Sequence, residues 1–300
     1  MTGARMTTPE VDCIQTVKAR LGETPLWCEQ TRRLVWIDIE DPHFWQLDPS
    51  TGEAFSRAQP CTYLGSQALT RSGKHLVARD LHLVMLDPQT GISELFARVP
   101  DERFPATRLN DGRVDRNGRL WIGTMDNGLK DGLGSLYRVD PDGSFAAFYD
   151  DVIVSNGIAF DPDGRHMYFT DTRRHLTWKI TLDDAGERPV SRAVFADYSA
   201  GGERPDGACV DADGCLWQAF FAGGRIVRYT PEGRIDRSID MPVTNPTCLC
   251  FGGPDYKTLF VTTAFKFLSE EQRANEPLAG SVFAISGAGQ GVAEHRFDFQ

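Results

Sequence analysis

Four oxygen-bearing side chains occupy a similar position relative to a large aromatic residue that follows each of them. They are Glu23, Asn110, Asn156 and Asp206, which precede Trp36, Trp121, Tyr168 and Trp217 by 13, 11, 12 and 11 residues, respectively. If the fold places these positions around one axis, two carboxylates and two amides form a ring of hard ligands. Such a ring suits Ca²⁺, Mg²⁺ or Mn²⁺, and Zn²⁺ and Fe²⁺ also accept oxygen ligands. Without a cation, the buried carboxylates would repel each other and lose hydration.

Each of these positions also has a simpler interpretation. Asn156-Gly157 and Asp206-Gly207 are ordinary turn dipeptides, and Glu23 could be a solvated loop residue. Connections between repeated units also favour turn residues, so the shared register is not independent proof. It is the coincidence of register that favours a metal-binding ring.

A polar rim is expected beside this ring. Six polar residues follow the aromatic residues within two to six positions: Asp38, Asp126, Asn127, Asp171, Thr172 and Arg173. Arg108 lies two residues before Asn110, and its forked donors could hold a carbonyl or hydroxyl group of a substrate. Alternatively, Arg108 neutralises nearby carboxylates. The sequence predicts a polar, acidic rim, which together with Arg108 suits a hydroxylated substrate.

Other hydrolytic motifs are absent from the sequence. It contains no GxSxG elbow, no HExxH pair and no Walker spacing. The six histidines show no paired spacing, so we interpret each as structural or exposed rather than as a metal ligand.

An internal repeat explains the shared register. The segments VDRNGRLWIGT, FDPDGRHMYFTDT and VDADGCLWQAF each combine a strand end, an Asp/Asn-Gly turn and a strand with a central aromatic residue. The central residues of six such units are Trp36, Leu76, Trp121, Tyr168, Trp217 and Phe260, separated by 40, 45, 47, 49 and 43 residues. These intervals are typical of propeller blades, and a second hairpin follows most of the markers.

The repeat predicts an all-β fold, a six-bladed β-propeller with four-stranded antiparallel blades, rather than a β-sandwich with irregular hairpins. A single domain over residues 1–300 is expected. The early run VDCIQTVKAR is expected to pair with the last blade, near SVFAISGAG or AEHRFDF, and so to close the ring. The innermost strands of a propeller run in one direction, which would bring the four oxygen-bearing side chains to one mouth of the tunnel.

The composition is that of a soluble globular protein, with 41% hydrophobic and 25% charged residues. The formal net charge of −10 disfavours nucleic acid and anionic membranes as partners. No signal peptide or membrane-spanning run is apparent, so a cytoplasmic protein is expected, as a monomer or weak oligomer. Seven cysteines without a CxxC pair fit reduced, mostly buried thiols.

Five segments together resemble one known family, in order and over nearly the full chain. They are LGETPLW, RLNDGRVDRNGRLWIGTM, SNGIAFDPDGRHMYFTDT, RPDGACVDADGCLWQAF and CLCFGGPDYKTLFVTTA. The family is that of senescence marker protein, regucalcin and gluconolactonase. The resemblance implies a six-bladed propeller that binds one divalent metal ion (Ca²⁺, Zn²⁺, Mn²⁺ or Fe²⁺) and hydrolyses sugar-acid lactones such as glucono-, xylono- or arabinonolactone.

The resemblance also assigns roles to residues. Glu23, Asn156 and Asp206 match the three metal ligands of the family, and Arg108 and Asn110 match positions that contact substrate or a metal-bound water. The family often carries a substrate-contacting acidic residue after its GTM motif, and Asp126 is the nearest match here.

A lactonase mechanism and its rivals follow from these assignments. The metal would polarise the ring carbonyl and activate water, with Asp206 as the general base and Arg108 and Asn110 holding the developing oxyanion or the ring hydroxyls. One rival is a hydrolase of the same fold that acts on phosphotriesters or other lactones. Another is a calcium-binding propeller without enzymatic activity, in which the metal is structural.

Overall fold

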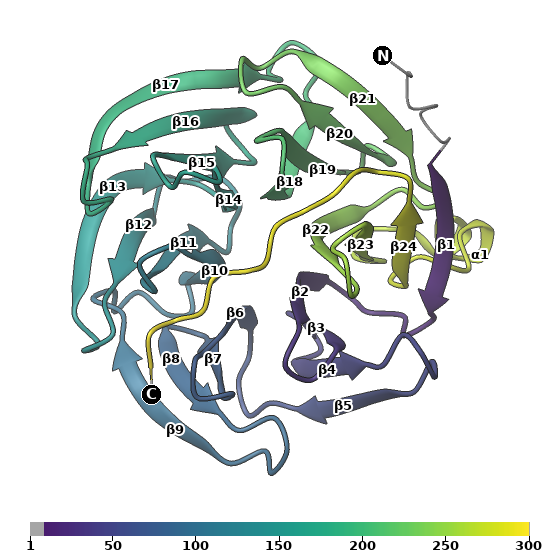
Figure 1. The fold of residues 1–300 in the computed structure, drawn as a ribbon, viewed down its shortest axis with the longest axis horizontal. Coiled ribbons are helices and arrows are strands. Elements are labelled where there is room, and N and C mark those ends of the chain that lie inside the picture. The colour runs from purple at the N-terminus through teal and green to yellow at the C-terminus, as the bar shows by residue number, and fades with distance from the viewer. Residues whose placement is uncertain (1–8, 300) are drawn as a thin grey trace.

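The computed structural model describes residues 9–299, which form six four-stranded antiparallel sheets and one short helix. The sheets are arranged as blades around a central axis, and each has its first strand innermost (Figure 1). The prediction of a six-bladed β-propeller is therefore confirmed. No helix within the described residues is both long enough and apolar enough to cross a membrane.

Blades one to three follow each other along the chain. Blade one contains β2 (Gly22–Cys28), β3 (Arg33–Asp38), β4 (His43–Leu47) and β5 (Ala54–Ala58). Blade two contains β6 (Leu64–Leu69), β7 (His75–Arg79), β8 (His82–Leu86) and β9 (Ser93–Arg98). Blade three contains β10 (Thr107–Val114), β11 (Leu120–Asp126), β12 (Gly134–Val139) and β13 (Phe145–Val152).

Blades four to six complete the ring. Blade four contains β14 (Ser155–Phe160), β15 (His166–Asp171), β16 (Leu176–Leu182) and β17 (Pro189–Asp197). Blade five contains β18 (Arg204–Val210), β19 (Leu216–Phe221), β20 (Arg225–Tyr229) and β21 (Ile235–Asp240). Blade six contains β22 (Pro246–Gly252), β23 (Thr258–Thr263), β24 (Val282–Ser286) and, as its outer strand, β1 (Glu10–Gln15). Helix α1 (Glu270–Asn275) is inserted between β23 and β24.

Strand β1 closes the ring as predicted. It pairs antiparallel with β24, with Val11 opposite Ile285 and Cys13 opposite Phe283. Of the two partners considered from sequence, SVFAISGAG is the correct one. Strand β1 is thereby hydrogen-bonded to the last blade, so segments from the two ends of the described chain are joined in one sheet.

The six marker residues lie in the second strand of each blade and are all buried: Trp36, Leu76, Trp121, Tyr168, Trp217 and Phe260. The apolar clusters join neighbouring blades. In one of them, Val35 and Ile37 of blade one pack in the same cluster as Val77 and Val84 of blade two. Burial between blades therefore fixes how the innermost strands are placed around the axis.

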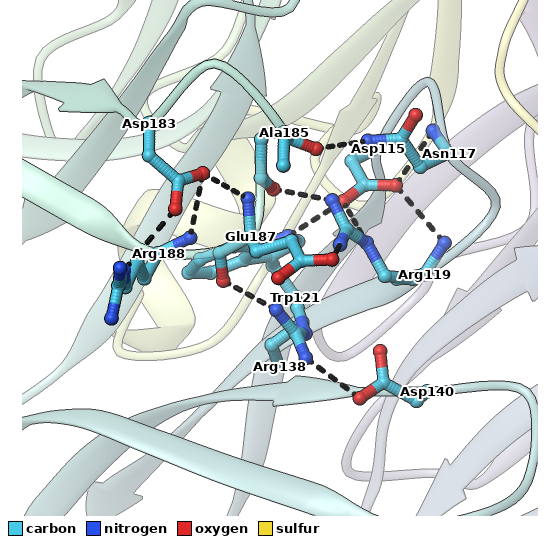
Figure 2. Close-up of polar contacts among 11 residues, drawn as sticks. Asp115, Asn117, Arg119, Trp121, Arg138, Asp140, Asp183, Ala185, Glu187 and Arg188 are labelled. Carbon is cyan, nitrogen blue, oxygen red and sulfur yellow. Dashed lines mark hydrogen bonds and ion pairs between the residues drawn. The ribbon is translucent and has the colours of Figure 1, made fainter.

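Polar contacts also join blades, as Figure 2 shows for blades three and four. The Asp115 carboxylate accepts hydrogen bonds from the indole of Trp121 (3.0 Å) and from Nε of Arg119 (2.9 Å). Arg119 then donates to the carbonyl of Gly186, and Asn117 Nδ2 donates to the carbonyl of Ala185 at 3.1 Å. The hairpin turn between β16 and β17 is thus tied to the turn of the preceding blade.

Candidate functional site

One pocket collects the residues that the sequence singled out. It lies at the mouth where the innermost strands begin, and Glu23 of β2, Asn156 of β14 and Asp206 of β18 line it. Arg108 and Asn110 of β10 line the same pocket. All five side chains are almost completely buried. The fold therefore brings these five residues together, although they are spread over 184 positions of the sequence, from 23 to 206.

A bulge marks the same place in each of these innermost strands. The pairing register shifts between Glu23 and Leu26, between Leu109 and Gly112, between Asn156 and Ala159, and between Pro205 and Ala208. A bulge re-aims side chains locally, so it turns the functional residues out of the ordinary alternation toward the pocket.

The two Asx-Gly dipeptides are thus part of strands and are not turns. Gly157 has a φ of +56°, and a Cβ there would lie 2.5 Å from Thr170 Oγ1. A Cβ on Gly207 would lie 2.4 Å from Sγ of Cys248 in the neighbouring blade. Only glycine lets these strands bulge and approach their neighbours so closely.

A chain of hydrogen bonds fixes the orientation of the two amides. Arg108 Nη1 donates to Asn110 Oδ1 at 2.6 Å, and Asn110 Nδ2 donates to Asn156 Oδ1 at 3.0 Å. Asn156 Nδ2 then donates to Thr172 Oγ1 at 2.8 Å, and this hydroxyl donates to the carbonyl of Pro205 at 2.7 Å. Because a guanidinium can only donate hydrogen bonds, Asn110 must turn its oxygen toward Arg108 and its NH2 group toward Asn156. The side-chain oxygen of Asn156 is therefore oriented as an acceptor.

The two carboxylates of the pocket are poorly satisfied. Glu23 accepts hydrogen bonds from the amide of Thr24, at 2.8 Å, and from the thiol of Cys248, whereas Asp206 accepts none from any described residue. Burial, together with the nearby charge of Asp111, raises the pKa of Glu23 to about 8. Burial and the charge of Glu23 raise the pKa of Asp206 well above its ordinary value.

This donor set fits a divalent cation. Within residues 9–299, no group of three or more His, Cys, Asp or Glu side chains is arranged to hold a metal ion, so a metal bound here would need an amide as a third protein ligand. Asp206 offers a carboxylate that accepts no hydrogen bond from a described residue, Glu23 offers a second carboxylate, and Asn156 offers an oriented amide oxygen. A cation of charge two would balance the two buried carboxylates, which otherwise repel each other.

Arg108 supplies a fixed positive charge at the side of the pocket. Burial lowers the pKa of its guanidinium to about 10, so the group stays charged at neutral pH. The guanidinium lies over the ring of Tyr63, 5.3 Å from the ring centre. Its bonds to Asn110 and to the carbonyl of Leu109 both use Nη1, which leaves Nη2 for a substrate oxygen.

The structure does not place Asp126 in the pocket. Its carboxylate accepts hydrogen bonds from the backbone amides of Gly128, Lys130 and Asp131, at 2.9, 3.0 and 2.8 Å. These amides hold the pKa of Asp126 below its ordinary value, against the effect of burial. Asp126 therefore shapes the loop after β11, and the neighbouring Met125 lines the pocket instead.

Of the six rim residues predicted from sequence, Thr172 and Arg173 line the pocket, but the acidic members do not, for the same reason as Asp126. Asp38 accepts hydrogen bonds from the backbone amides of Arg20 and Leu21, and Asp171 accepts them from Ile153 and Val154. The carboxylates at the ends of these second strands thus bind the backbone of the loop that precedes the innermost strand. Besides the five residues already named, the charged side chains that line the pocket are basic: Arg173, Arg204 and Lys266.

Sequence reasoning missed two of these cations and the apolar wall of the pocket. Arg204 lies two residues before Asp206, the same spacing that led to Arg108 before Asn110, so the register could have identified it. Lys266 follows β23 and carried no comparable signal. The apolar wall includes Leu21, Ile39, Phe221 and Phe267, which come from blades one, five and six.

The sequence of this chain is similar to those of known proteins. Residues 21–265 match a family model described as the SMP-30/gluconolactonase/LRE-like region. A 6-deoxy-6-sulfogluconolactonase of Pseudomonas putida is 37% identical, over 95% of this chain and 97% of the relative. Regucalcin of Xenopus laevis is 31% identical, over 97% of this chain and 99% of the relative.

A solved structure agrees in fold over nearly the whole chain. The calcium-binding protein regucalcin of Agrobacterium tumefaciens superposes with a TM-score of 0.91 at 30% identity, covering 95% of this chain and 96% of that one. The agreement extends around the complete ring of blades.

Proposed function

The chain belongs to the SMP-30/gluconolactonase/LRE-like family, and we propose that it is a lactonase, which hydrolyses a sugar-acid lactone to the open acid with the help of one divalent metal ion. Glucono-, xylono- and arabinonolactone are the substrates to test first. Family membership supports lactone hydrolysis, and the pocket supports the dependence on a metal.

The observation that carries the proposal is the convergence of Glu23, Asn156 and Asp206 with Arg108 and Asn110 in one buried pocket. The first three provide oxygen ligands, and Arg108 provides a positive charge that does not depend on a cofactor. A lactone needs both, because its carbonyl oxygen becomes negatively charged when water adds to the carbonyl carbon.

A divalent ion held by Glu23, Asn156 and Asp206 would supply Lewis-acid polarisation of the lactone carbonyl. Asp206 takes the proton of the attacking water, because its carboxylate faces the pocket without a hydrogen-bond donor. Water adds to the carbonyl carbon, the ring C–O bond then breaks, and Asp206 returns its proton to the ring oxygen, which leaves a carboxylic acid and a hydroxyl group. Arg108 Nη2 holds the oxygen on which charge develops.

The proposal is tested by proton release from aldonolactones. Protein stripped of metal is assayed with gluconolactone, xylonolactone and arabinonolactone, with Ca²⁺, Mn²⁺, Zn²⁺ or Fe²⁺ added back and the spontaneous rate subtracted. Turnover that requires metal is expected, and Asp206→Asn should lower kcat by about 100-fold or more. An aryl phosphotriester in the same panel tests the rival substrate class.

Two controls give this test its meaning. Asp213→Asn removes a carboxylate from the same blade outside the pocket and should leave turnover unchanged. Thermal unfolding of Asp206→Asn shows whether the fold is kept. Near wild-type turnover by Asp206→Asn would rule out its role as base, and uncatalysed rates with every lactone and metal would overturn the lactonase proposal.

A further inference from the structure

Two arginines at the boundary of blades four and five line the pocket without a carboxylate partner. Arg173 follows β15 and is exposed, whereas Arg204 begins β18 and is half-buried. Both line the pocket that contains Glu23 and Asp206. Within residues 9–299, neither guanidinium forms an ion pair, and Arg204 makes no hydrogen bond through its side chain.

The carboxylates nearest to them in sequence are already engaged. Glu203 pairs with Arg225, and Asp171 accepts bonds from backbone amides and pairs with Arg174 at 3.3 Å. Arg173 itself donates from Nε to the carbonyl of Leu129 at 3.1 Å, which leaves its two terminal nitrogens for other acceptors. Both guanidinium groups are therefore available to a ligand.

Two hydrogen bonds bring the arginine-bearing segments side by side. Thr172, next to Arg173, donates to the carbonyl of Pro205, next to Arg204, at 2.7 Å. Nδ1 of His175 lies 2.6 Å from the carbonyl oxygen of Glu203, on the other side of the two arginines. The segments are thus tied together on both sides of the pair.

The same contacts connect the pair to the candidate metal site. Thr172 accepts a hydrogen bond from Asn156 at 2.8 Å, and Arg204 is two residues from Asp206. A molecule bound at Asp206 and Asn156 therefore has Arg173 and Arg204 beside it. Anything attached to it on the side of blades four and five meets their positive charge.

The charge of the pocket favours an anion. A divalent cation would cancel the charges of Glu23 and Asp206, and Lys266 is paired with Glu40. Arg108, Arg173 and Arg204 then line the pocket without an ion-pair partner among the described residues, in a protein whose formal net charge is −10. Such local concentration of one sign, against the charge of the whole chain, attracts and orients a ligand of the opposite sign.

We propose that Arg173 and Arg204 form a subsite for a phosphate or sulfonate group carried by the lactone at a carbon outside the ring ester. Guanidinium groups suit such tetrahedral oxyanions, because their planar fork can donate two parallel hydrogen bonds. The inference rests on the proposed lactonase function and defines its substrate class as anionic sugar lactones.

The test compares a neutral lactone with two anionic ones. Gluconolactone, 6-phosphogluconolactone and 6-deoxy-6-sulfogluconolactone are assayed with the wild-type protein, Arg173→Gln, Arg204→Gln and the double variant. Loss of charge-assisted hydrogen bonds should lower kcat/KM of the double variant on the anionic lactones by about 10- to 100-fold more than on gluconolactone, mainly through KM. The anionic lactone with the higher wild-type kcat/KM identifies the group as phosphate or sulfonate.

Arg188→Gln is the matched control, since it removes one positive charge from blade four at a residue that is outside the pocket and paired with Asp183. This variant should have the same kcat/KM as the wild-type protein on each of the three lactones. Equal losses on neutral and anionic lactones, or a wild-type protein that prefers gluconolactone, would overturn the subsite.

Failure of the lactonase proposal gives a different result, namely no turnover of any lactone. The subsite is then decided by calorimetric titration with 6-phosphogluconate. Binding by the wild-type protein that the double variant loses supports an anion site in a protein of another activity, and no binding by the wild-type protein refutes it.

Discussion

At the scale of single residues, the number of hydrogen-bond donors around a buried carboxylate distinguishes a structural role of that carboxylate from a functional one. Asp206 and Asp211 follow one another closely in blade five, and both are buried. Asp211 accepts hydrogen bonds from the indole of Trp217 at 2.9 Å and from Nε of Arg228 at 2.7 Å. Asp206 faces the pocket and receives none. A carboxylate left without donors is costly to the fold, which is why we assign it to a ligand.

His75 is a buried residue that should make stability depend on pH. Its ring packs edge-on against Phe44, and Nδ1 lies 3.2 Å from Gln67 Oε1. Burial, with a smaller effect of Arg296, lowers the pKa of His75 from 6.5 to about 3. The folded state keeps the ring neutral where the unfolded chain is protonated, so stability is lost as the pH falls below 6.5.

We therefore expect His75 to account for a loss of about 2 kcal/mol in the free energy of unfolding between pH 7.5 and pH 5. Urea unfolding at the two pH values measures it. His75→Gln should show a correspondingly smaller decline, whereas His295→Gln, at an exposed position, should decline like the wild-type protein. Equal declines in all three proteins would contradict the assignment.

At the scale of elements, the innermost strands combine two tasks. Each must pair with the second strand of its blade, and each must also present a side chain to the tunnel. The bulges at Glu23 and Asn156 allow both, because the extra residue leaves the ladder locally and the strand resumes its register afterwards. The functional residues thus lie in rigid strands rather than in mobile loops.

The turn between the first and second strands of blade five is held by one carboxylate. Besides Trp217 and Arg228, Asp211 accepts hydrogen bonds from the amides of Asp213 and Cys215, both at 3.0 Å. Asp211→Asn replaces one carboxylate oxygen by an NH2 group, so either the two turn amides or the donors of Trp217 and Arg228 lose their acceptor. We expect it to lower the free energy of unfolding by about 2–4 kcal/mol, measured by urea unfolding.

Asp213→Asn provides the comparison within the same ion cluster. Asp213 pairs with the same Arg228 at 2.7 Å, but its side chain is 79% exposed. Its loss should cost less than about 1 kcal/mol, because exposed pairs are screened by water. Similar effects of the two substitutions would show that the turn does not depend on the buried carboxylate.

At the scale of the whole molecule, the C-terminal segment crosses the ring after β24 (Figure 1). It contacts blade five, where Ala212 donates to the carbonyl of Gln290 at 2.8 Å, and blade two, where Phe297 donates to the carbonyl of Leu69 at 2.8 Å. Both contacts lie just past or at the C-terminal ends of innermost strands, opposite the pocket. The segment therefore links distant blades and covers the far mouth of the tunnel.

A buried ion pair anchors this segment. Glu294 pairs with Arg113 of β10, which also donates to the carbonyl of Ala208 at 2.9 Å. Because Glu294→Gln leaves the Arg113 charge buried without its partner, we expect a loss of about 3 kcal/mol in the free energy of unfolding. Denaturant titration measures the loss.

The double variant Arg113→Gln/Glu294→Gln and the surface variant Glu29→Gln complete that experiment. The double variant should lose less than the sum of the single variants, because it removes both members of the ion pair together. Glu29 pairs with Arg296 of the same segment at 3.0 Å but is 42% exposed, so its substitution should have a small effect. Additive losses would argue against an ion pair that anchors the segment.

Much of this protein could be predicted from its sequence. The spacing of Trp36, Trp121 and Trp217 indicated the blades, because each blade repeats the same burial pattern in its second strand. The register of Glu23 and Asp206 indicated the candidate site, because equivalent positions of successive blades surround one axis. Both predictions depend on local periodicity, which the sequence carries directly.

Only the tertiary structure decided which way side chains face. Asp126 and Asp206 are both acidic residues near a blade marker, yet backbone amides of its own loop surround Asp126, and Asp206 faces the pocket. Likewise, the arginines at 173 and 204 become a pair only because hydrogen bonds join their loops across two blades. Sequence spacing determines the position of a residue around the ring, whereas its charge environment depends on contacts between segments that are far apart in the chain.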